Sequence, residues 1–353
     1  MLSPAEFREI VSGRRPGVAA TLWRGMFSVV EPFYTFAVRY RNSRFDSDRL
    51  KITRVAVPVV SVGNLTLGGT GKTPMVEWLA RWFLDRGVRV ALVSRGYGAT
   101  DGAANDEAKE LHDKLPTVPH LLNPKRVIAA QEAIEKHAAQ LIILDDGFQH
   151  RRLARDLDIL LVDATEPFGH EHVFPRGALR EPLDGFARAD VIALSRADCV
   201  DDSTRQAIRQ RISDFNPNAL WIELKHAPRA LRNTNAQSAP LSELTGKRVL
   251  AFCGIGNPSS FHHVLTGTGC QIAAFQEYPD HHAYSPEDLA AINRTAESAQ
   301  VDAIVCTHKD LVKVGVQALT SRPIWALEIG MQITEGQAEF ERRLNVLARR
   351  AGC

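Results

Sequence analysis

One segment constrains this 353-residue chain more than any other, the run Thr66-Leu67-Gly68-Gly69-Thr70-Gly71-Lys72-Thr73. It follows the apolar run Val55 to Val62, which predicts a buried strand, and it precedes an amphipathic run that ends at Gly87. A glycine loop between a strand and a helix lets backbone N–H groups surround phosphate oxygens. The sequence therefore predicts a P-loop whose eight residues contact ATP, although Thr66 stands where the common pattern has glycine.

Within that loop, Lys72 is expected to reach the β and γ phosphates, and the Thr73 hydroxyl is expected to bind Mg²⁺. A second magnesium ligand normally comes from the end of a neighbouring strand. Four apolar residues that precede Asp145 and Asp146 predict such a strand. We expect Asp145 to face the metal, with Asp146 as the alternative and as a residue of the catalytic site.

Short apolar runs alternate with helical patterns after residue 54, which is typical of a largely parallel sheet flanked by helices. In the first part of the chain these strands are predicted at Val55 to Val62, Val88 to Ser94, Leu141 to Asp146, Leu157 to Asp163 and Val191 to Ser195. A second series is predicted at Arg248 to Cys253, Gln271 to Phe275, Val301 to Thr307 and Pro323 to Ile329. The fold class is thus α/β, P-loop NTPase-like, with a second, smaller αβ domain.

The domain organisation follows from shifts in composition. We expect an N-terminal basic and aromatic helical segment over residues 1–54 and a nucleotide-binding domain over 55–225. A polar linker rich in Pro, Asn and Ser is expected over 226–243, the smaller domain over 244–330, and a C-terminal helix over 331–353.

The first 54 residues carry ten basic and five acidic side chains, a net charge of +5 in a chain whose total is +2. Between residues 17 and 38, Leu22, Met26, Val29, Phe33 and Ala37 form an apolar stripe at helical spacing. Arg24 and Glu31 lie on the opposite face, which argues against a transmembrane helix. The pattern favours a helix lying on an anionic membrane surface, or else a helix packed on the protein's own core.

The five cysteines are odd in number and form no CxxC motif, which predicts reduced thiols in a cytosolic compartment. No signal peptide is visible at the N-terminus. The expected compartment is therefore the cytosol.

Several motifs in order resemble the tetraacyldisaccharide 4′-kinase family. They are Gly63-Asn64-Leu65-Thr66 leading into the glycine loop, Ser94-Arg95-Gly96-Tyr97-Gly98, Asp145-Asp146-Gly147-Phe148-Gln149-His150, Leu179-Arg180-Glu181-Pro182, Gly254-Ile255-Gly256-Asn257-Pro258, Asp280-His281-His282-Ala283-Tyr284 and Lys309-Asp310. The resemblance implies transfer of the ATP γ-phosphate to the 4′-hydroxyl of tetraacyldisaccharide 1-phosphate, with Mg²⁺, in lipid A biosynthesis. It also implies a peripheral location on the cytoplasmic face of the inner membrane. The implied partners are a lipid substrate and an anionic inner-membrane surface, with no nucleic acid and no obligate protein partner.

The same resemblance implies the remaining site residues. Asp106, in Asn105-Asp106-Glu107-Ala108, matches the catalytic aspartate of a family Gly-Asp-Glu-Pro motif whose flanking Gly and Pro are replaced here. His281 matches a histidine that works beside it. Arg180 is expected to neutralise phosphoryl charge or the lipid 1-phosphate, with Arg176 as a nearby competitor. Arg95, Tyr97, Gln149 and Arg180 are the expected substrate contacts.

Two other functions stay open. A membrane-recruited P-loop switch ATPase that acts on a protein partner would explain the glycine loop, Asp145 and the basic segment equally well, but not the ordered motifs after them. The Asp-His-His triplet also suggests a metal-dependent phosphoesterase, which would work without ATP.

Overall fold

The structure is a computed structural model that describes residues 2, 4–96, 106–235, 237–280, 282–314 and 322–352. The chain divides into two compact units. The first comprises Met1–Lys225 with Ile333–Cys353, and the second comprises His226–Gln332. Strands β7 (Leu220–Arg232) and β12 (Ile324–Glu335) each belong in part to both units.

The first unit is built on a parallel sheet with the strand order β7-β6-β5-β1-β4-β2-β3. Its other strands are β1 (Val59–Asn64), β2 (Val90–Ser94), β3 (His120–Leu122), β4 (Leu141–Asp145), β5 (Leu157–Asp163) and β6 (Val191–Ser195). Central strands β1 and β4 are buried along their whole length, as a parallel sheet covered on both faces requires. The α/β prediction is confirmed.

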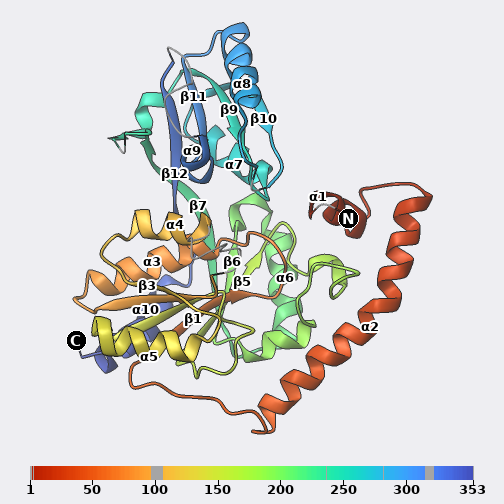
Figure 1. Ribbon diagram of the computed structural model, residues 1–353, viewed down its shortest axis with the longest axis vertical. Coiled ribbons are helices and arrows are strands. Elements are labelled where there is room, and N and C mark those ends of the chain that lie inside the picture. Colours follow the sequence, from red (N-terminus) through yellow and green to blue (C-terminus); the bar gives the residue numbers. More distant parts are fainter. Residues whose placement is uncertain are drawn as a thin grey trace. The chain divides into compact units, whose positions relative to one another are not determined.

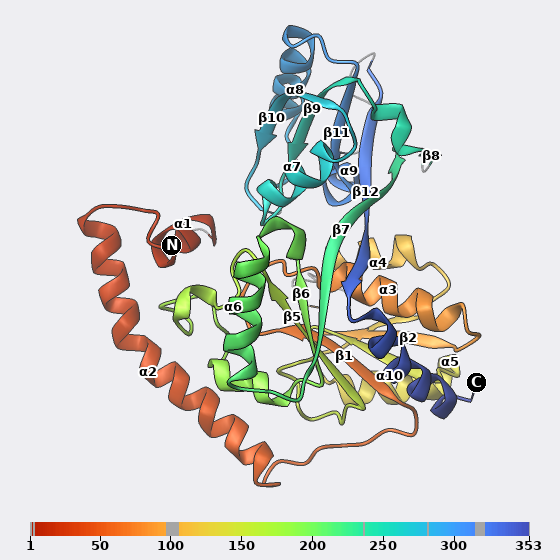
Figure 2. The ribbon, with the colours of Figure 1, turned by 180° about the vertical axis from the view of Figure 1, so that it is seen from behind.

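Helices cover both faces of this sheet (Figures 1 and 2). They are α3 (Lys72–Leu84), α4 (Asp106–Lys114), α5 (Arg126–His137), α6 (Asp202–Ser213) and α10 (Gln337–Arg350), with the short 3-10 turns η1 (Gly169–Glu171), η2 (Leu183–Arg188) and η3 (Ala197–Cys199). Helix α5 packs on β1, β2 and β4 through Ala129 and Ala130. The C-terminal helix α10 returns to this unit, where the fully buried Phe340 stacks on Trp78 of α3.

The N-terminal segment forms α1 (Pro4–Val11) and the 29-residue α2 (Val18–Asp46), which contains Pro32. Every residue of the predicted apolar stripe is exposed, and Phe33 is the most exposed of its large side chains at 73%. Phe27, Val38 and Phe45 lie buried on the inward side. No described helix combines the length and apolar character that crossing a bilayer needs.

The second unit has its own parallel strands, β10 (Gln271–Glu277), β9 (Arg248–Cys253), β11 (Ala303–Thr307) and β12, paired in that order. Its helices are α7 (Pro258–Thr266), α8 (Pro286–Ser298) and α9 (His308–Val314), with the turn η4 (Leu241–Leu244). The two-residue strand β8 (Ser238–Ala239) pairs antiparallel with β7. Two apolar clusters, one on each face of β9 and β11, form its core.

Some boundaries differ from the sequence expectations for physical reasons. Strand β1 begins at Val59 because the preceding Pro58 has no N–H to donate, while the Val59 N–H donates to Asp156 Oδ2 at 2.9 Å. Strand β4 ends at Asp145 because Asp146 takes a left-handed conformation with φ of 52°. Residues 226–232, expected in a linker, belong to β7.

Candidate functional site in the first unit

The glycine loop connects β1 to α3 as the sequence predicts. Gly68 and Gly71 have φ of 122° and 91°, which only glycine adopts without strain. A Cβ added at Gly68 or Gly69 would meet nothing within 4 Å, so this part of the loop has open space beside it. Thr70 and Thr73 are buried. The loop therefore has the open backbone at a helix N-terminus that binds phosphate groups.

Lys72, the first residue of α3, points back toward the ends of two central strands. Its Nζ lies 3.3 Å from Asn64 Oδ1 at the end of β1 and 3.6 Å from Asp146 Oδ1. Only 10% of the Lys72 side chain is exposed. A buried ammonium group beside an open phosphate loop is placed to neutralise phosphate charge.

Asp146 forms ion pairs with two basic side chains of the site. Arg180 Nη1 donates to both of its carboxylate oxygens, at 2.9 and 2.8 Å. Burial alone would raise the pKa of the Asp146 carboxyl, but the charges of Lys72, Arg180 and Arg126 hold it below its ordinary value. Asp146 is therefore ionised and links Lys72 to Arg180.

Asp145 is the last residue of β4 and is buried, and its register partner is Val62 of the neighbouring β1. Thr73 stands in the first turn of α3, directly after the loop. A carboxylate and a hydroxyl are the hard oxygen donors that Mg²⁺ prefers, so this pair fits the metal that the loop implies. Both predicted ligands thus lie at the carboxyl edge of the sheet.

An arginine that was not expected at the site contacts the glycine loop. Arg196 follows β6, donates through Nη2 to the Gly69 carbonyl oxygen at 2.8 Å, and forms a short ion pair with Asp163 at the end of β5. The carboxylate aims the guanidinium at the backbone of the loop. Asp163 and Arg196 lie at the carboxyl ends of adjacent strands. This position is the only local feature of the sequence that indicates a role for them.

The charge of one buried arginine acts on the two aspartates and on Arg95. Arg126 is buried at the start of α5. Burial lowers the pKa of Arg126, and the positive charge of Arg95 lowers it further. The negative charges of Asp146 and Asp145 raise the pKa and so oppose this shift. Burial also lowers the pKa of His150 to about 4, and the charges of Arg126, Arg155, Arg152 and Arg95 act in the same direction. Arg95, a predicted substrate contact, therefore belongs to a basic group suited to an anion.

Of three predicted residues, one is described through its backbone alone and two are not described. Asp106 is the first residue of α4, whose described side chains begin at Ala108. Tyr97 and His281 lie outside the described residues. The neighbouring His282 accepts or donates a 2.9 Å hydrogen bond with Asp288 and stacks on Tyr278 within the second unit. The ring of His282 is thus held by packing.

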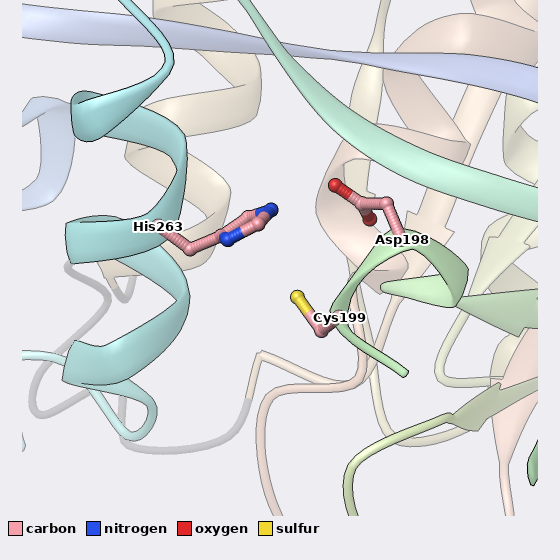
Figure 3. A group of neighbouring side chains, drawn as sticks. All are labelled: Asp198, Cys199 and His263. Atoms are coloured by element: carbon pink, nitrogen blue, oxygen red, sulfur yellow. The ribbon is translucent and has the colours of Figure 1, made fainter. Parts of the chain in front are cut away.

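Figure 3 draws Asp198 and Cys199 on η3 and His263 on α7. Two of these residues belong to the first unit and one to the second. We infer no metal site from them.

Comparisons with known proteins identify the family of this chain. The family model described as tetraacyldisaccharide-1-P 4′-kinase matches residues 23–349. The chain belongs to this family. A tetraacyldisaccharide 4′-kinase of Anaeromyxobacter sp. (strain K) is 38% identical over 94% of this chain and 92% of its own length. One from Syntrophus aciditrophicus is 36% identical over 90% and 91%.

A solved structure of a family member is also similar. LpxK from Aquifex aeolicus, crystallised in complex with ATP, has a TM-score of 0.71 and 27% identity, covering 92% of this chain and 99% of that one. Membership of the tetraacyldisaccharide 4′-kinase family accounts for the ordered motifs that a switch ATPase leaves unexplained.

Proposed function

We propose that this protein transfers the γ-phosphate of ATP to the 4′-hydroxyl of tetraacyldisaccharide 1-phosphate, forming the 1,4′-bisphosphate of lipid A biosynthesis. The observation that carries the proposal is the phosphate loop with Lys72, Asp146 and Arg180 joined by ion pairs at one sheet edge. Family membership over most of the chain supplies the substrate.

Several described residues have separate roles in the proposed phosphoryl transfer. Lys72 neutralises charge on the β and γ phosphates, and the loop from Thr66 to Thr73 holds their oxygens through backbone N–H groups. Arg180 neutralises charge on the transferred phosphoryl group, held in place by Asp146. Thr73 and Asp145 would hold Mg²⁺, which would supply neutralisation of the phosphate charge.

The acceptor hydroxyl must lose a proton as it attacks. A sugar hydroxyl is a poor nucleophile, so a carboxylate near the γ-phosphate is needed to accept that proton. We assign this role to Asp106 at the start of α4, with His281 in support. Arg95, Tyr97 and Gln149 are the proposed contacts to the acceptor.

The N-terminal segment is the proposed attachment to the cytoplasmic face of the inner membrane. On α2, the side chains of Leu22, Val29 and Phe33 are 69%, 67% and 73% exposed. A contiguous apolar stripe on a basic segment is suited to an anionic lipid surface. The protein would therefore meet its acylated acceptor as a peripheral protein.

The deciding experiment follows labelled γ-phosphate from Mg-ATP to purified disaccharide 1-phosphate lipid in detergent micelles. We expect the wild type to make bisphosphorylated lipid, and Lys72→Ala and Asp106→Asn to lower turnover by about 10² to 10⁴-fold without loss of folding. Asp113→Asn, an exposed carboxylate on the same helix as Asp106, is the matched control and should retain wild-type turnover.

Other outcomes point elsewhere. A wild type that binds ATP and labels no lipid would favour the switch ATPase, above all if a protein partner stimulated hydrolysis. Wild-type turnover in either Lys72→Ala or Asp106→Asn would remove that residue from the mechanism.

A further inference from the structure

Glu181 is a fully buried carboxylate in the first unit, and it receives donors from three separate segments. Arg188 Nη2 lies 2.8 and 2.9 Å from its two oxygens, Gln149 Nε2 lies 3.0 Å from Oε1, and Asn42 Nδ2 lies 2.9 Å from Oε2. A carboxylate without water depends on every one of these partners. Glu181 therefore fixes the positions of α2, of the loop after β4 and of η2 relative to one another.

The same stretch of chain holds the start of the phosphate loop. The Arg180 N–H donates to the Leu65 carbonyl at 2.6 Å, and the Leu67 N–H donates to the Ala178 carbonyl at 2.6 Å. Gln149, besides binding Glu181, donates to the carbonyl of Asn64 at the end of β1. Movement of residues 178–181 would therefore move the loop that binds phosphate.

Helix α2 contacts this stretch directly. Asn42 donates to Glu181, and the Tyr34 hydroxyl donates to the Arg180 carbonyl oxygen at 3.2 Å. Both side chains are half-buried, whereas Phe33 and Phe36 beside Tyr34 are more than 70% exposed. Apolar side chains on one side of α2 thus face solvent, while side chains on the other side donate hydrogen bonds to Glu181 and Arg180.

We propose that Asn42 and Tyr34 of α2 are positioning residues for phosphoryl transfer. Acting through Glu181 and Arg180, they set the geometry of the phosphate loop and of the Arg180–Asp146 ion pair. The helix thereby contributes to the turnover of the enzyme as well as to its attachment to lipid. This inference rests on the proposed kinase function, and it assigns to the inward face of α2 a role that lipid attachment does not require.

The phosphoryl transfer step tolerates little displacement of the groups around the phosphate. Small displacements of groups around the reacting phosphate cost large factors in rate. Loss of the Asn42 amide would leave Glu181 Oε2 with Arg188 as its described hydrogen-bond donor, and the carboxylate would shift toward that arginine. Gln149 and the start of the loop would follow it.

The test uses the full-length protein with saturating acceptor in detergent micelles. We expect Asn42→Ala and Tyr34→Phe each to lower kcat about tenfold and to weaken ATP affinity, with KM for the acceptor unchanged. Arg39→Gln is the matched control, since Arg39 also pairs α2 with the body, through Asp184 at 3.6 Å, but is not among the donors to Glu181. That variant should keep wild-type kcat, and thermal unfolding should show all three folded.

A double-mutant cycle tests whether the effect passes through Glu181. Asn42→Ala combined with Glu181→Gln should lose no more kcat than Glu181→Gln alone, because both changes break one connection. Should Glu181→Gln fail to fold, the pair Asn42→Ala and Tyr34→Phe still carries the test.

Two results would overturn the inference. One is wild-type kcat and ATP affinity in both single variants, and the other is a change confined to the acceptor KM, which would restrict α2 to lipid attachment. A wild type that labels no lipid would contradict the proposed function instead. Calorimetric titration with ATP in the absence of lipid would still test the link from Asn42 to the phosphate loop.

Discussion

Arg180 and Arg176 are four residues apart, and either could serve as the cation for the transferred phosphoryl group. The structure distinguishes them by their contacts, because Arg180 forms a two-oxygen contact with Asp146, which also pairs with Lys72. We expect Arg180→Lys to lower kcat by about 10 to 100-fold. Nη1 of the guanidinium binds Asp146 and leaves the other nitrogens for the phosphoryl group, whereas a lysine has one nitrogen for both. Arg176→Lys should keep wild-type kcat. The reverse ranking in a steady-state assay of lipid phosphorylation would reassign the role to Arg176.

His120 makes the stability of the first unit depend on pH. It pairs with Ser94 Oγ through Nε2 at 3.0 Å, and burial lowers its pKa from 6.5 to about 4. Between those two pH values the unfolded chain binds a proton that the folded protein does not, so stability falls as pH falls through this window. The loss attributable to one group is at most about 1.4 kcal/mol per pH unit.

Urea unfolding of wild type and His120→Gln at pH 7.5 and pH 5 measures this contribution. The variant should lose less stability than wild type over that interval, although His150, whose pKa is also lowered to about 4, keeps part of the dependence. His137→Gln removes an exposed histidine and should leave the pH dependence unchanged. Equal losses in wild type and His120→Gln would contradict the assignment.

Much of the phosphate site could be predicted from sequence because its residues are consecutive. The glycine loop, Lys72, Asp145 and Asp146 each follow a short apolar run that marks a strand end. Glu181 follows no such run, and Arg196 follows one although its contact with the loop could not be predicted from it. Glu181 meets Asn42 across 139 positions and Arg196 meets Gly69 across 127, so their contacts depend on strand order, which a single sequence does not contain.

At the scale of elements, α3 and α4 are joined by a buried ion network. Lys114 Nζ lies 3.3 Å from Glu77 Oε2 and 2.9 Å from Glu110 Oε1, and each of these side chains is about 10% exposed or less. Arg81 also pairs with Glu77. Because α3 begins at Lys72 and α4 begins at Asp106, this network helps to fix the helix of the proposed base against the helix of the phosphate loop.

Lys114→Met should be strongly destabilising. It removes the ammonium group that pairs with the buried Glu110 carboxylate and leaves Glu77 with its Arg81 pair. Removing one partner of a buried ion pair costs about 3–5 kcal/mol. Thermal unfolding should show a midpoint several degrees lower, and kcat should fall with it. Lys136→Met breaks the exposed pair with Glu132 and serves as control, with an unfolding midpoint close to wild type. A midpoint in Lys114→Met that matched the control would show that the network contributes nothing.

Strands β5, β6 and β9 agree with the prediction at both ends, and β2, β4, β10 and β11 differ by one or two residues. Strand β1 begins four residues later than predicted, and β12 ends six residues later. The strands β3 and β7 were missed. Strand β3 has only three half-buried residues, and β7 becomes half-polar after Leu224, where it passes into the second unit. Neither has the continuous apolar run that identifies a buried parallel strand.

At the scale of the whole molecule, charge and apolar exposure coincide in one segment. Residues 1–54 have a net charge of +5, so the remaining 299 residues sum to −3. The same segment contains most of the exposed large hydrophobic side chains of the described residues, among them Leu22, Met26, Val29 and Phe33. Attraction to anionic lipid would therefore act on this segment first and would weaken with ionic strength.

Sedimentation with vesicles that contain about 30% anionic phospholipid tests this attachment. We expect Leu22→Ser with Phe33→Ser to reduce binding by at least tenfold, since burying each side chain is worth about 1.5–3 kcal/mol. Raising NaCl from about 0.1 to 0.5 M should weaken wild-type binding as well. Val346→Ser changes an exposed apolar residue on α10 and should bind like wild type. Binding that is unchanged in the double variant and insensitive to salt would exclude α2 as the attachment. In micelles the double variant should raise the acceptor KM and leave kcat alone, the opposite division from that expected for Asn42→Ala.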